Sequence, residues 1–437
     1  MTAAPVSLSA YRALTHCLRP LAELILWRRV RAGKEEAERL DERRGRASLP
    51  RPAGPVMWIH GASVGESLSA LPLIARLREE RPDLFCLVTT GTVTSARLLA
   101  ERLPEGSCHQ YIPIDHPVYV HRFLDHWRPD GGLFIEAELW PVLLSACQRR
   151  DIPLALLNGR LSPSAFEGWS KRPRVAAALY GAFSVLTAQD QDNAARLTTL
   201  ARRPVESPGN LKQAAPPPPA EPAAISALKA AIGDRPVILA ASTHAGEEEL
   251  ILRVHQELRG DYPSLLTLIV PRHPERGADI DAMIAAKGLS GGRRSVTPWP
   301  RPSDAVFIAD TLGELGLFYR LTVPTFMGGS LVDRGGHNPI EPAHLSVPLF
   351  VGPHLFNFAE TYAALEQVQA VIQVSDVKTL ATAMAAALRA PAEANAMGGR
   401  ARSWAERGGA DVMDRTIDYL APLLPAKPHQ PTKGGTP

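Results

Sequence analysis

The sequence predicts an α/β protein built from two Rossmann-like, doubly wound domains that face a central cleft. Short continuous apolar runs alternate with longer amphipathic stretches, as strands and helices do in such folds. One proline-rich stretch interrupts this series near the middle of the chain. The 437 residues are also too many for one ordinary core, so we expect two lobes with a ligand site between them.

The expected strands are mostly continuous rather than alternating apolar runs, which favours parallel strands covered by helices on both faces. In the first half these runs cover residues 56–60, 84–90, 109–114, 132–136, 154–157 and 183–187, with helices such as 68–80 and 142–149 between them. In the second half they cover residues 236–241, 265–270, 305–309, 323–327 and 348–351.

The interruption and the chain ends set the expected domain boundaries. We expect an amphipathic and basic N-terminal segment at 1–50, a first Rossmann-like domain at 51–207 and a second at 223–421. Between the domains, residues 208–222 include four consecutive prolines and predict a stiff linker, because proline continues neither a helix nor a central strand. Residues 422–437 are rich in proline and polar residues and are expected to be disordered.

The N-terminal segment carries an apolar patch at residues 21–27, flanked by arginines. The patch is too short to span a bilayer, contains Glu23 and precedes no small-residue cleavage site, so it is neither a membrane span nor a signal peptide. An amphipathic helix here either lies in a bilayer interface beside anionic headgroups or packs on its own domain. Its apolar side chains are Leu18, Leu21, Leu24, Ile25 and Trp27. The alternating charges at 34–46 predict a solvated helix surface.

Composition and missing motifs exclude several classes of protein. A formal net charge of +3, without interleaved aromatic and basic residues, argues against nucleic-acid binding. The four cysteines form no CxxC pair, which argues against a zinc site and a disulfide framework and favours a reducing cytosol. The chain has no GxGxxG after its first strand, no GxxxxGK[ST] and no His–Glu–x–x–His. We therefore expect no bound metal and no dinucleotide.

A strand, a turn of small residues and a helix start follow one another at residues 58–66. Such a turn lets a substrate approach closely, and Glu66 near the helix start would accept a proton from an attacking hydroxyl. The alternative is that Glu66 only complements the positive end of the helix.

Two acids, Glu136 and Glu138, directly follow a strand that the pattern predicts to be buried. Charges at such a place are costly unless they are paired or used, although one of the two acids has a simpler role as a helix cap. Lys212 in the sequence GNLK puts a cation beside the linker and hence beside the expected cleft. The alternative for a lone lysine is a solvated side chain.

Polar groups also follow several strands of the second domain. Residues 241–244 and 271–276 place hydroxyls, Arg272 and His273 at one sheet edge, which suits an anion. The glycine-rich stretches 310–315 and 328–342 supply backbone N–H groups that bind phosphate well. Glu341, just inside a predicted helix, would accept hydrogen bonds from a ribose; the alternative is a purely structural loop.

Eight motifs occur in order along the chain: HGASVGE, EAELWP, NGRLS, GNLK, ASTHAGEEE, PRHPER, DTLGEL and GGSLVDRGGHNPIEP. Together they resemble the bacterial transferases of 3-deoxy-D-manno-octulosonic acid (Kdo), over about residues 58–358. The resemblance implies the two-domain GT-B architecture and a short N-terminal helix that associates with the cytoplasmic face of the inner membrane. Ala137, Gly159 and Ala245 depart from the usual family wording, and none of these departures removes a proposed catalytic residue.

The resemblance also implies roles for individual residues. Glu66 matches the catalytic base of the family, and Glu136 and Lys212 match its two residues that stabilise the transition state. His273 is a further candidate beside the positions that would contact CMP. Those positions are Pro271, Arg272, Leu312, Gly313, Glu314, Asn338, Pro339, Ile340 and Glu341.

The implied reaction is an inverting transfer of Kdo from CMP-Kdo to a lipid A precursor, a tetraacyldisaccharide 1,4'-bisphosphate, in lipopolysaccharide biosynthesis of Gram-negative bacteria. Its partners are CMP-Kdo, the lipid acceptor and the inner-membrane surface, with no tightly bound cofactor. Another GT-B nucleotide-sugar transferase or an epimerase is the alternative within enzymes. A membrane-peripheral lipid-binding scaffold is the non-enzymatic alternative, and the joint presence of Glu66, Glu136 and Lys212 argues against it.

Overall fold

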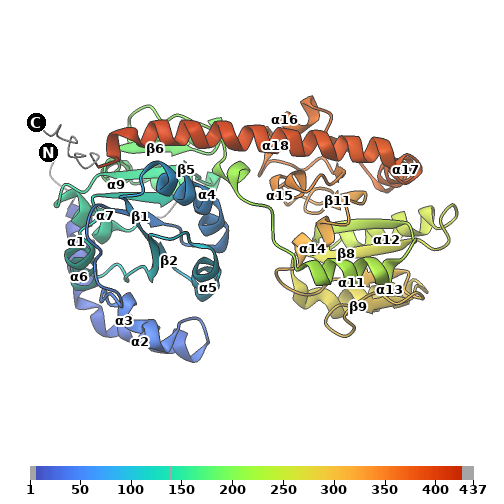
Figure 1. Ribbon diagram of the computed structural model, residues 1–437, viewed down its shortest axis with the longest axis horizontal. Coiled ribbons are helices and arrows are strands. Elements are labelled where there is room, and N and C mark those ends of the chain that lie inside the picture. The colour runs from blue at the N-terminus through green and yellow to red at the C-terminus, as the bar shows by residue number, and fades with distance from the viewer. Residues whose placement is uncertain (1–5, 137–138, 426–437) are drawn as a thin grey trace, which may run out of the picture. The chain divides into compact units, whose positions relative to one another are not determined.

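Figure 1 shows the computed structural model of the chain, which describes residues 6–136 and 139–425. The chain divides into two compact units: the first comprises Met1–Ala215 and Gly408–Pro437, and the second comprises Pro216–Arg407. Each unit contains one parallel sheet with a core layer on each of its faces, which confirms the predicted α/β class. The division after Ala215 falls inside the stretch 208–222 that was expected to be a linker.

The sheet of the first unit has the strand order β3-β2-β1-β4-β5-β6 and is parallel throughout. Successive residues of β1 face opposite core layers: Val56 and Trp58 pack in one, Met57 and Ile59 in the other. Burial of both faces explains why these strands appear in the sequence as continuous apolar runs. The strands are β1 (Val56–His60), β2 (Phe85–Thr90), β3 (Ser107–Tyr111), β4 (Gly131–Ile135), β5 (Leu154–Gly159) and β6 (Val185–Ala188).

Helices connect these strands, and several begin at a side chain that caps free backbone N–H groups. Ser63, Thr92 and Asp190 each accept a hydrogen bond from the third residue of the helix that they precede. Asp115 reaches the start of another helix, α7, and accepts two of its N–H groups. The helices are α4 (Val64–Glu80), α5 (Val93–Arg102), α6 (Pro117–Trp127), α7 (Pro141–Gln148), α8 (Pro163–Ser170), α9 (Pro173–Tyr180), α10 (Gln191–Ala201) and η2 (Leu211–Ala214).

The sheet of the second unit has the order β13-β12-β11-β7-β8-β10-β9 and is also parallel. Its strands are β7 (Val237–Thr243), β8 (Leu266–Pro271), β9 (Gly291–Arg293), β10 (Val306–Ile308), β11 (Thr325–Met327), β12 (Leu349–Val351) and β13 (Val371–Gln373). The edge strands β9 and β13 were not predicted, because β9 has the sequence Gly-Gly-Arg without an apolar side chain and β13 has two apolar residues before the polar Gln373. The helices are α11 (Pro222–Ile232), α12 (Glu247–Leu258), η3 (Pro274–Arg276), α13 (Gly277–Ala286), α14 (Leu315–Tyr319), α15 (Ile340–His344), α16 (Ala359–Gln367) and α17 (Val377–Arg389).

The long helix α18 (Pro391–Leu420) contributes residues to both units. From Gly408 onward its residues belong to the first unit, where Val412, Met413 and Leu420 join a core layer with residues of α4. The second domain was expected to continue to residue 421, but local sequence does not indicate which core receives the apolar face of a helix. Leu423, in the short helix η4 (Ala421–Leu423), is buried in the same layer. The tail 422–437 was expected to be disordered, and this prediction is wrong for residues 422–425, which include the buried Leu423; residues 426–437 lie outside the described residues.

Two helices precede the first sheet, α1 (Val6–Cys17) and α2 (Arg19–Arg31). Leu26 is buried, but an apolar face formed by other side chains stays between 41% and 57% exposed. The alternative that this segment packs on its own domain therefore holds for Leu26 and for Glu23, which pairs with Arg44, but not for the apolar face, which stays exposed. No helix in the described part of the chain is long and apolar enough to cross a membrane. The apolar face consists of Leu14, Leu18, Leu21, Leu24, Ile25 and Trp27.

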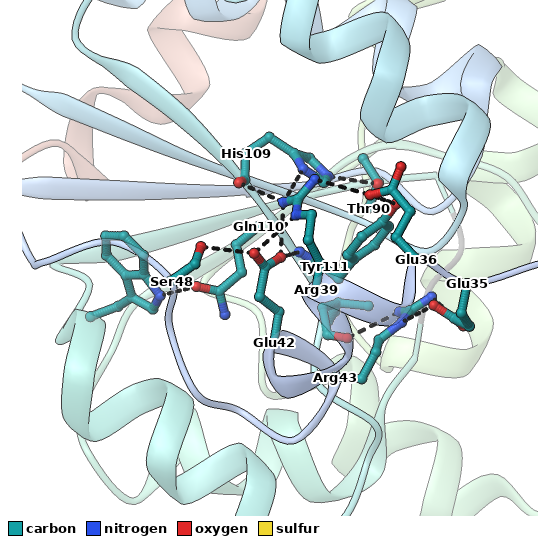
Figure 2. Close-up of polar contacts among 12 residues, drawn as sticks. Glu35, Glu36, Arg39, Glu42, Arg43, Ser48, Thr90, His109, Gln110 and Tyr111 are labelled. Carbon is teal, nitrogen blue, oxygen red and sulfur yellow. Dashed lines mark hydrogen bonds and ion pairs between the residues drawn. The ribbon is translucent and has the colours of Figure 1, made fainter. Parts of the chain in front are cut away.

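The alternating charges at 34–46 were expected to be solvated, and this prediction is wrong for Glu35, Glu42 and Arg43, which are buried; the exposed residues of the stretch include Lys34, Glu38, Asp41 and Arg46. Figure 2 shows that the three buried side chains, with Glu36 and Arg39, form a network against β3, the edge strand of the first sheet. Arg43 contacts both carboxylate oxygens of Glu35 at 3.0 Å and donates to the carbonyl of Ile112 at 3.0 Å. Glu42 accepts the N–H of Tyr111 at 2.8 Å. The segment, which includes η1 (Ala37–Arg39) and α3 (Leu40–Arg43), thus pairs backbone groups that an edge strand leaves free.

Arg39 completes this network through His109, as Figure 2 also shows. Its guanidinium donates to His109 Nδ1 at 2.9 Å, while His109 Nε2 lies 2.9 Å from the Thr90 hydroxyl. Because a guanidinium can only donate, Nδ1 must be the acceptor and the ring is neutral. Burial, and then the charge of Arg39, lower the pKa of His109 to about 3.

Candidate active site

Glu66 is the third residue of α4, directly after the turn that follows β1. Its Oε2 accepts the Ala62 N–H at 2.7 Å, and its Oε1 accepts the Ser63 hydroxyl at 2.8 Å. A Cβ on Gly61 would lie only 3.2 Å from Glu66 Cβ, so the small residue allows this close turn. Glu66 therefore has the helix-start contacts that the structural alternative expects. Each carboxylate oxygen still has a second lone pair, so these contacts leave room for a proton-accepting role.

The surroundings of Glu66 favour its protonated form. Burial raises the pKa of Glu66, and this effect exceeds the lowering by the hydrogen bonds from Ser63 and Ala62. The charge of Glu136 adds to the rise, whereas the charge of Lys212 opposes it. A carboxylate with a raised pKa is a stronger base, so this environment suits proton transfer.

Glu136 and Lys212 form an ion pair in which Lys212 Nζ lies 2.5 Å from Glu136 Oε1. Lys212 is therefore not the solvated cation of the alternative interpretation. Glu136 follows β4, is 9% exposed and has a φ of 68°, in the left-handed region that residues with side chains seldom adopt. Such conformations occur often where a site constrains a side chain. Glu138 and Ala137 lie outside the described residues.

The carboxyl ends of the parallel strands explain why these residues come together. β1 and β4 are neighbours, with His60 paired to Phe134, so the segments that follow them leave the same edge of the sheet. Asn158 near the end of β5 adds a contact that sequence analysis did not assign: its Oδ1 accepts the Leu211 N–H at 2.9 Å, next to Lys212. The only sequence signal for it was its place in the motif NGRLS.

His60, at the end of β1, lies inside this edge of the sheet. It is fully buried, and its Nδ1 lies 3.1 Å from the Thr89 carbonyl and 3.0 Å from the Thr89 hydroxyl. Burial lowers the pKa of His60 to about 3, so the ring is neutral. Among the described residues, the ionisable groups that the candidate site brings together in the first unit are Glu66, Glu136 and Lys212.

In the second unit, the residues after β8 divide into exposed and structural ones. Pro271 ends β8 and is buried, whereas Arg272 and His273 are exposed. Arg276 instead pairs with the buried carboxylate of Glu248 at 2.5 Å. Of the two arginines in PRHPER, Arg272 is therefore the one whose side chain is accessible to an anion.

A pair of stacked histidines lies between two loops of the second unit. His244 and His337 have ring centroids 5.1 Å apart and Nε2 atoms 3.0 Å apart. Burial lowers the pKa of both, to about 4 for His337, so the contact joins two neutral rings.

Glu247 fixes the two loops that carry these histidines. It is fully buried, and its carboxylate accepts the N–H groups of His244 at 2.9 Å and Gly329 at 2.7 Å. It also accepts those of Ser330 and Leu331, both at 3.1 Å. The glycine-rich loop is thus held by one carboxylate with four backbone donors.

The loop after β10 holds three of the predicted CMP positions. Leu312 is 82% exposed, and Gly313 has a φ of 81°, which favours glycine. Glu314 pairs with Arg294 at 2.6 Å, and this contact is the main cause of its lowered pKa.

The remaining predicted positions surround the short helix α15. Asn338 Oδ1 accepts the Ile340 N–H at 3.1 Å, and Pro339 is the cap residue. Glu341 lies in the first turn of α15, as the sequence predicted. Within residues 6–136 and 139–425, no group of three or more His, Cys, Asp or Glu side chains could hold a metal ion.

Comparison with known proteins gives the family of the chain. The sequence model of the 3-deoxy-D-manno-octulosonic-acid transferase (kdotransferase) family matches residues 38–215. The 3-deoxy-D-manno-octulosonic acid transferase of Haemophilus influenzae is 35% identical over 89% of this chain and 92% of its own length. That of Bordetella pertussis is also 35% identical, over 93% of this chain and 97% of its own.

Solved structures extend the comparison to the fold. A putative UDP-N-acetylglucosamine 2-epimerase from Listeria monocytogenes aligns with a TM-score of 0.58 over 84% of this chain and 96% of that one. At 12% identity this likeness concerns the fold alone, which is of the GT-B type. The two relatives match this chain over most of its length at 35% identity. The chain therefore belongs to the 3-deoxy-D-manno-octulosonic acid transferases, a family of glycosyltransferases.

Proposed function

We propose that this chain transfers Kdo from CMP-Kdo to a lipid A precursor with inversion, and that Glu66 is the general base. The observation that carries the proposal is the cluster in the first unit. It contains a carboxylate with a raised pKa and, in electrostatic contact with it, an ion pair that supplies a cation. Family membership supports Kdo as the transferred sugar.

The chemistry asks for a base on one face of the sugar and a stabilised leaving group on the other. The acceptor hydroxyl attacks the anomeric carbon, a new C–O bond forms, and the bond to the phosphate oxygen of CMP breaks with its electron pair. Glu66 accepts the hydroxyl proton during the attack. Its raised pKa supports this role, because the carboxylate then holds the proton more firmly.

Lys212 and Glu136 would stabilise the transition state. An oxocarbenium-like transition state of Kdo has a carboxylate next to the reacting carbon, and an ammonium group near it is favourable. Lys212 Nζ, held 2.5 Å from the largely buried Glu136, is already oriented and needs little reorganisation.

The second unit would bind CMP-Kdo. Arg272, with an exposed side chain, and the N–H groups of the glycine-rich loops meet the phosphate of CMP. His273 assists beside them, and Glu341 in the first turn of α15 accepts hydrogen bonds from the ribose. The remaining positions that would contact CMP are Pro271, Leu312, Gly313, Glu314, Asn338, Pro339 and Ile340.

The apolar face of α1 and α2 would meet the cytoplasmic side of the inner membrane, where a lipid acceptor resides. Its leucines are accompanied by exposed Arg19, Arg28 and Arg31, a combination that suits an interface with anionic headgroups. A peripheral attachment of this kind needs no membrane-spanning helix.

The test is a transfer assay with a CMP-Kdo generating system and a tetraacylated lipid A precursor, read by CMP release and by mass spectrometry of the lipid. The wild type is expected to release CMP and form a Kdo-lipid, whereas Glu66→Gln, which keeps its hydrogen-bonding shape, does not. Product mass then counts the sugars added.

Three results would each contradict part of the proposal. Release of nucleotide only from another nucleotide sugar would assign the chain to a different GT-B activity. Binding of lipid vesicles without turnover of verified substrates would indicate a lipid-binding scaffold. Full transfer by Glu66→Gln would support the transfer activity but show that Glu66 is not the general base.

A further inference from the structure

Asn158, in the motif NGRLS, has no role in the chemistry proposed above. It lies near the end of β5, where the pairing with β6 shifts its register between Leu156 and Gly159. Its φ of 56° is left-handed, a conformation that asparagine adopts more readily than most residues with side chains. Irregularities of this kind occur next to active sites, where they redirect a side chain.

The redirected side chain reaches the backbone of the segment that carries Lys212. Asn158 Oδ1 accepts the N–H of Leu211 at 2.9 Å, and both residues are buried. One residue further along, the Lys212 N–H donates to Asn210 Oδ1 at 3.0 Å. Asn158 thus connects the sheet to the residue immediately before Lys212.

The residue before Asn158 fixes the other partner of the ion pair. The carbonyl of Leu157 accepts the Glu136 N–H at 2.9 Å. Two consecutive residues of β5 therefore hold the backbone at Glu136 and the backbone beside Lys212. Both attachments start from the end of β5. The same strand end therefore positions both residues of the 2.5 Å contact between Lys212 Nζ and Glu136 Oε1.

The two polar atoms of the Asn158 side chain differ in their contacts. Asn158 Nδ2 is buried and has no hydrogen-bond partner in the described part of the chain. An unpaired buried donor costs free energy. We therefore expect the hydrogen bond of Asn158 Oδ1 to offset the cost of the unpaired Nδ2.

We propose that Asn158 is a positioning residue that holds Lys212 against Glu136 through the Leu211 N–H. The proposal rests on the proposed role of Lys212 in the transfer reaction. The competing explanation is that the buried side chain of Leu211, which is 2% exposed, anchors this segment without help.

Two variants of the full-length protein separate these explanations. Asn158→Gly keeps the left-handed backbone without strain but removes the acceptor, while Asn158→Asp keeps an oxygen acceptor in either protonation state. We expect Asn158→Gly to lower kcat on the order of 10²-fold, as misplacement of a charged group does, with little change in the KM for CMP-Kdo. Asn158→Asp is expected to recover most of the loss. In the double variant with Lys212→Ala, kcat should be no lower than in Lys212→Ala alone, because both changes act through one group.

Hydrogen exchange at the Leu211 amide, measured without substrates, gives a readout that is independent of activity. Exchange should be faster in Asn158→Gly and close to wild type in Asn158→Asp. Wild-type kcat and unchanged exchange in Asn158→Gly would overturn the proposal, as would a double variant slowed by the product of the two single effects. If Lys212→Ala itself transfers Kdo normally, the proposed role of Lys212 is wrong. Faster exchange in Asn158→Gly would then still uphold the positioning contact, and unchanged exchange would reject it.

Discussion

Replacing Glu66 by glutamine separates its helix-start contacts from its role as a base. In the wild type, one carboxylate oxygen faces the Ala62 N–H and the other faces the Ser63 hydroxyl. Glutamine keeps both contacts in one orientation: its oxygen accepts the Ala62 N–H, and its NH₂ group donates to Ser63 Oγ. Ser63 is exposed, so its own hydrogen is free to turn to water.

The expected effects on stability and on activity are therefore very different. Every polar group at this turn keeps a partner, so Glu66→Gln should change the free energy of unfolding by no more than about 1 kcal/mol, the net worth of one hydrogen bond. An amide accepts no proton, and loss of a general base lowers kcat by roughly 10²–10⁴-fold.

Glu247→Gln is the matched control, because the same substitution there meets four N–H donors and no hydroxyl. Its carboxylate oxygens each accept two backbone N–H groups, from His244 and Gly329 on one side and Ser330 and Leu331 on the other. Whichever way the amide turns, its NH₂ group leaves two of these donors unpaired. At about 1–3 kcal/mol for each buried unpaired group, the loss is about 2–6 kcal/mol.

Calorimetric unfolding and initial rates of CMP release, measured on both variants and the wild type, check this reasoning. Glu66→Gln should unfold like the wild type and be inactive, and Glu247→Gln should unfold at a lower temperature. A wild-type kcat in Glu66→Gln would mean that Glu66 has a structural role at the helix start and is not the base. A Glu66→Gln protein as unstable as Glu247→Gln would refute the hydrogen-bond argument, whatever its activity.

Three further results are expected. Ser63→Ala removes a hydrogen bond that lowers the pKa of Glu66, so the acid limb of the kcat/KM profile should move to higher pH; a shift to lower pH would contradict this. Arg43→Met removes the partner that contacts both oxygens of buried Glu35, which keeps its 2.7 Å contact with Arg29, and should cost about 1–3 kcal/mol in urea unfolding, with part of the loss recovered by adding Glu35→Gln. His109, whose pKa of about 3 lies below the unfolded value near 6.5, contributes stability above pH 6.5 that is lost as pH falls towards 3. The loss is up to about 1.4 kcal/mol per pH unit, and His109→Gln should flatten the stability profile over that range; an unchanged slope would refute the assignment.

The central strands of both sheets could be predicted because each is buried on two faces. The expected runs 56–60 and 84–90 correspond to β1 and β2, and 236–241 and 265–270 correspond to β7 and β8. The end of α18 could not be assigned to the first unit, since the core that receives Val412 and Leu420 is set by tertiary packing. A local apolar pattern contains no information about such a distant partner.

The charged stretch 34–46 was misinterpreted for a related physical reason. Alternating acids and bases are typical of a solvated helix, and that expectation ignores the backbone groups left free on an edge strand. Here Glu42 and Arg43 supply partners to Tyr111 and Ile112 at the edge of the first sheet. The requirement for these partners appears only once the strand order is known.

Residue types led to the proposed members of the candidate site but not to their contacts. Glu66 was singled out by its place near a helix start after a turn of small residues, and Glu136 because an acid follows a strand that looks buried. The pairing of Lys212 with Glu136 could not be derived, because it joins residues that are far apart in the sequence. Asn158 carried no chemical signal, since its importance comes from a left-handed backbone at a register shift.

The proposed base and the proposed cation of the candidate site have separate supports, and this separation has a consequence for mutation. Glu66 is held by its own helix start through Ala62 and Ser63, whereas the ion pair of Lys212 is held from β5 through Asn158. Changes at Ser63 should therefore alter the proton affinity of the base and leave the cation in place. Changes at Asn158 should displace the cation and affect the base only through the charge of Lys212, which lowers the pKa of Glu66. A pH profile that moves in Ser63→Ala, beside a kcat that falls in Asn158→Gly, would support two different attachments of the site, which the charge of Lys212 still couples.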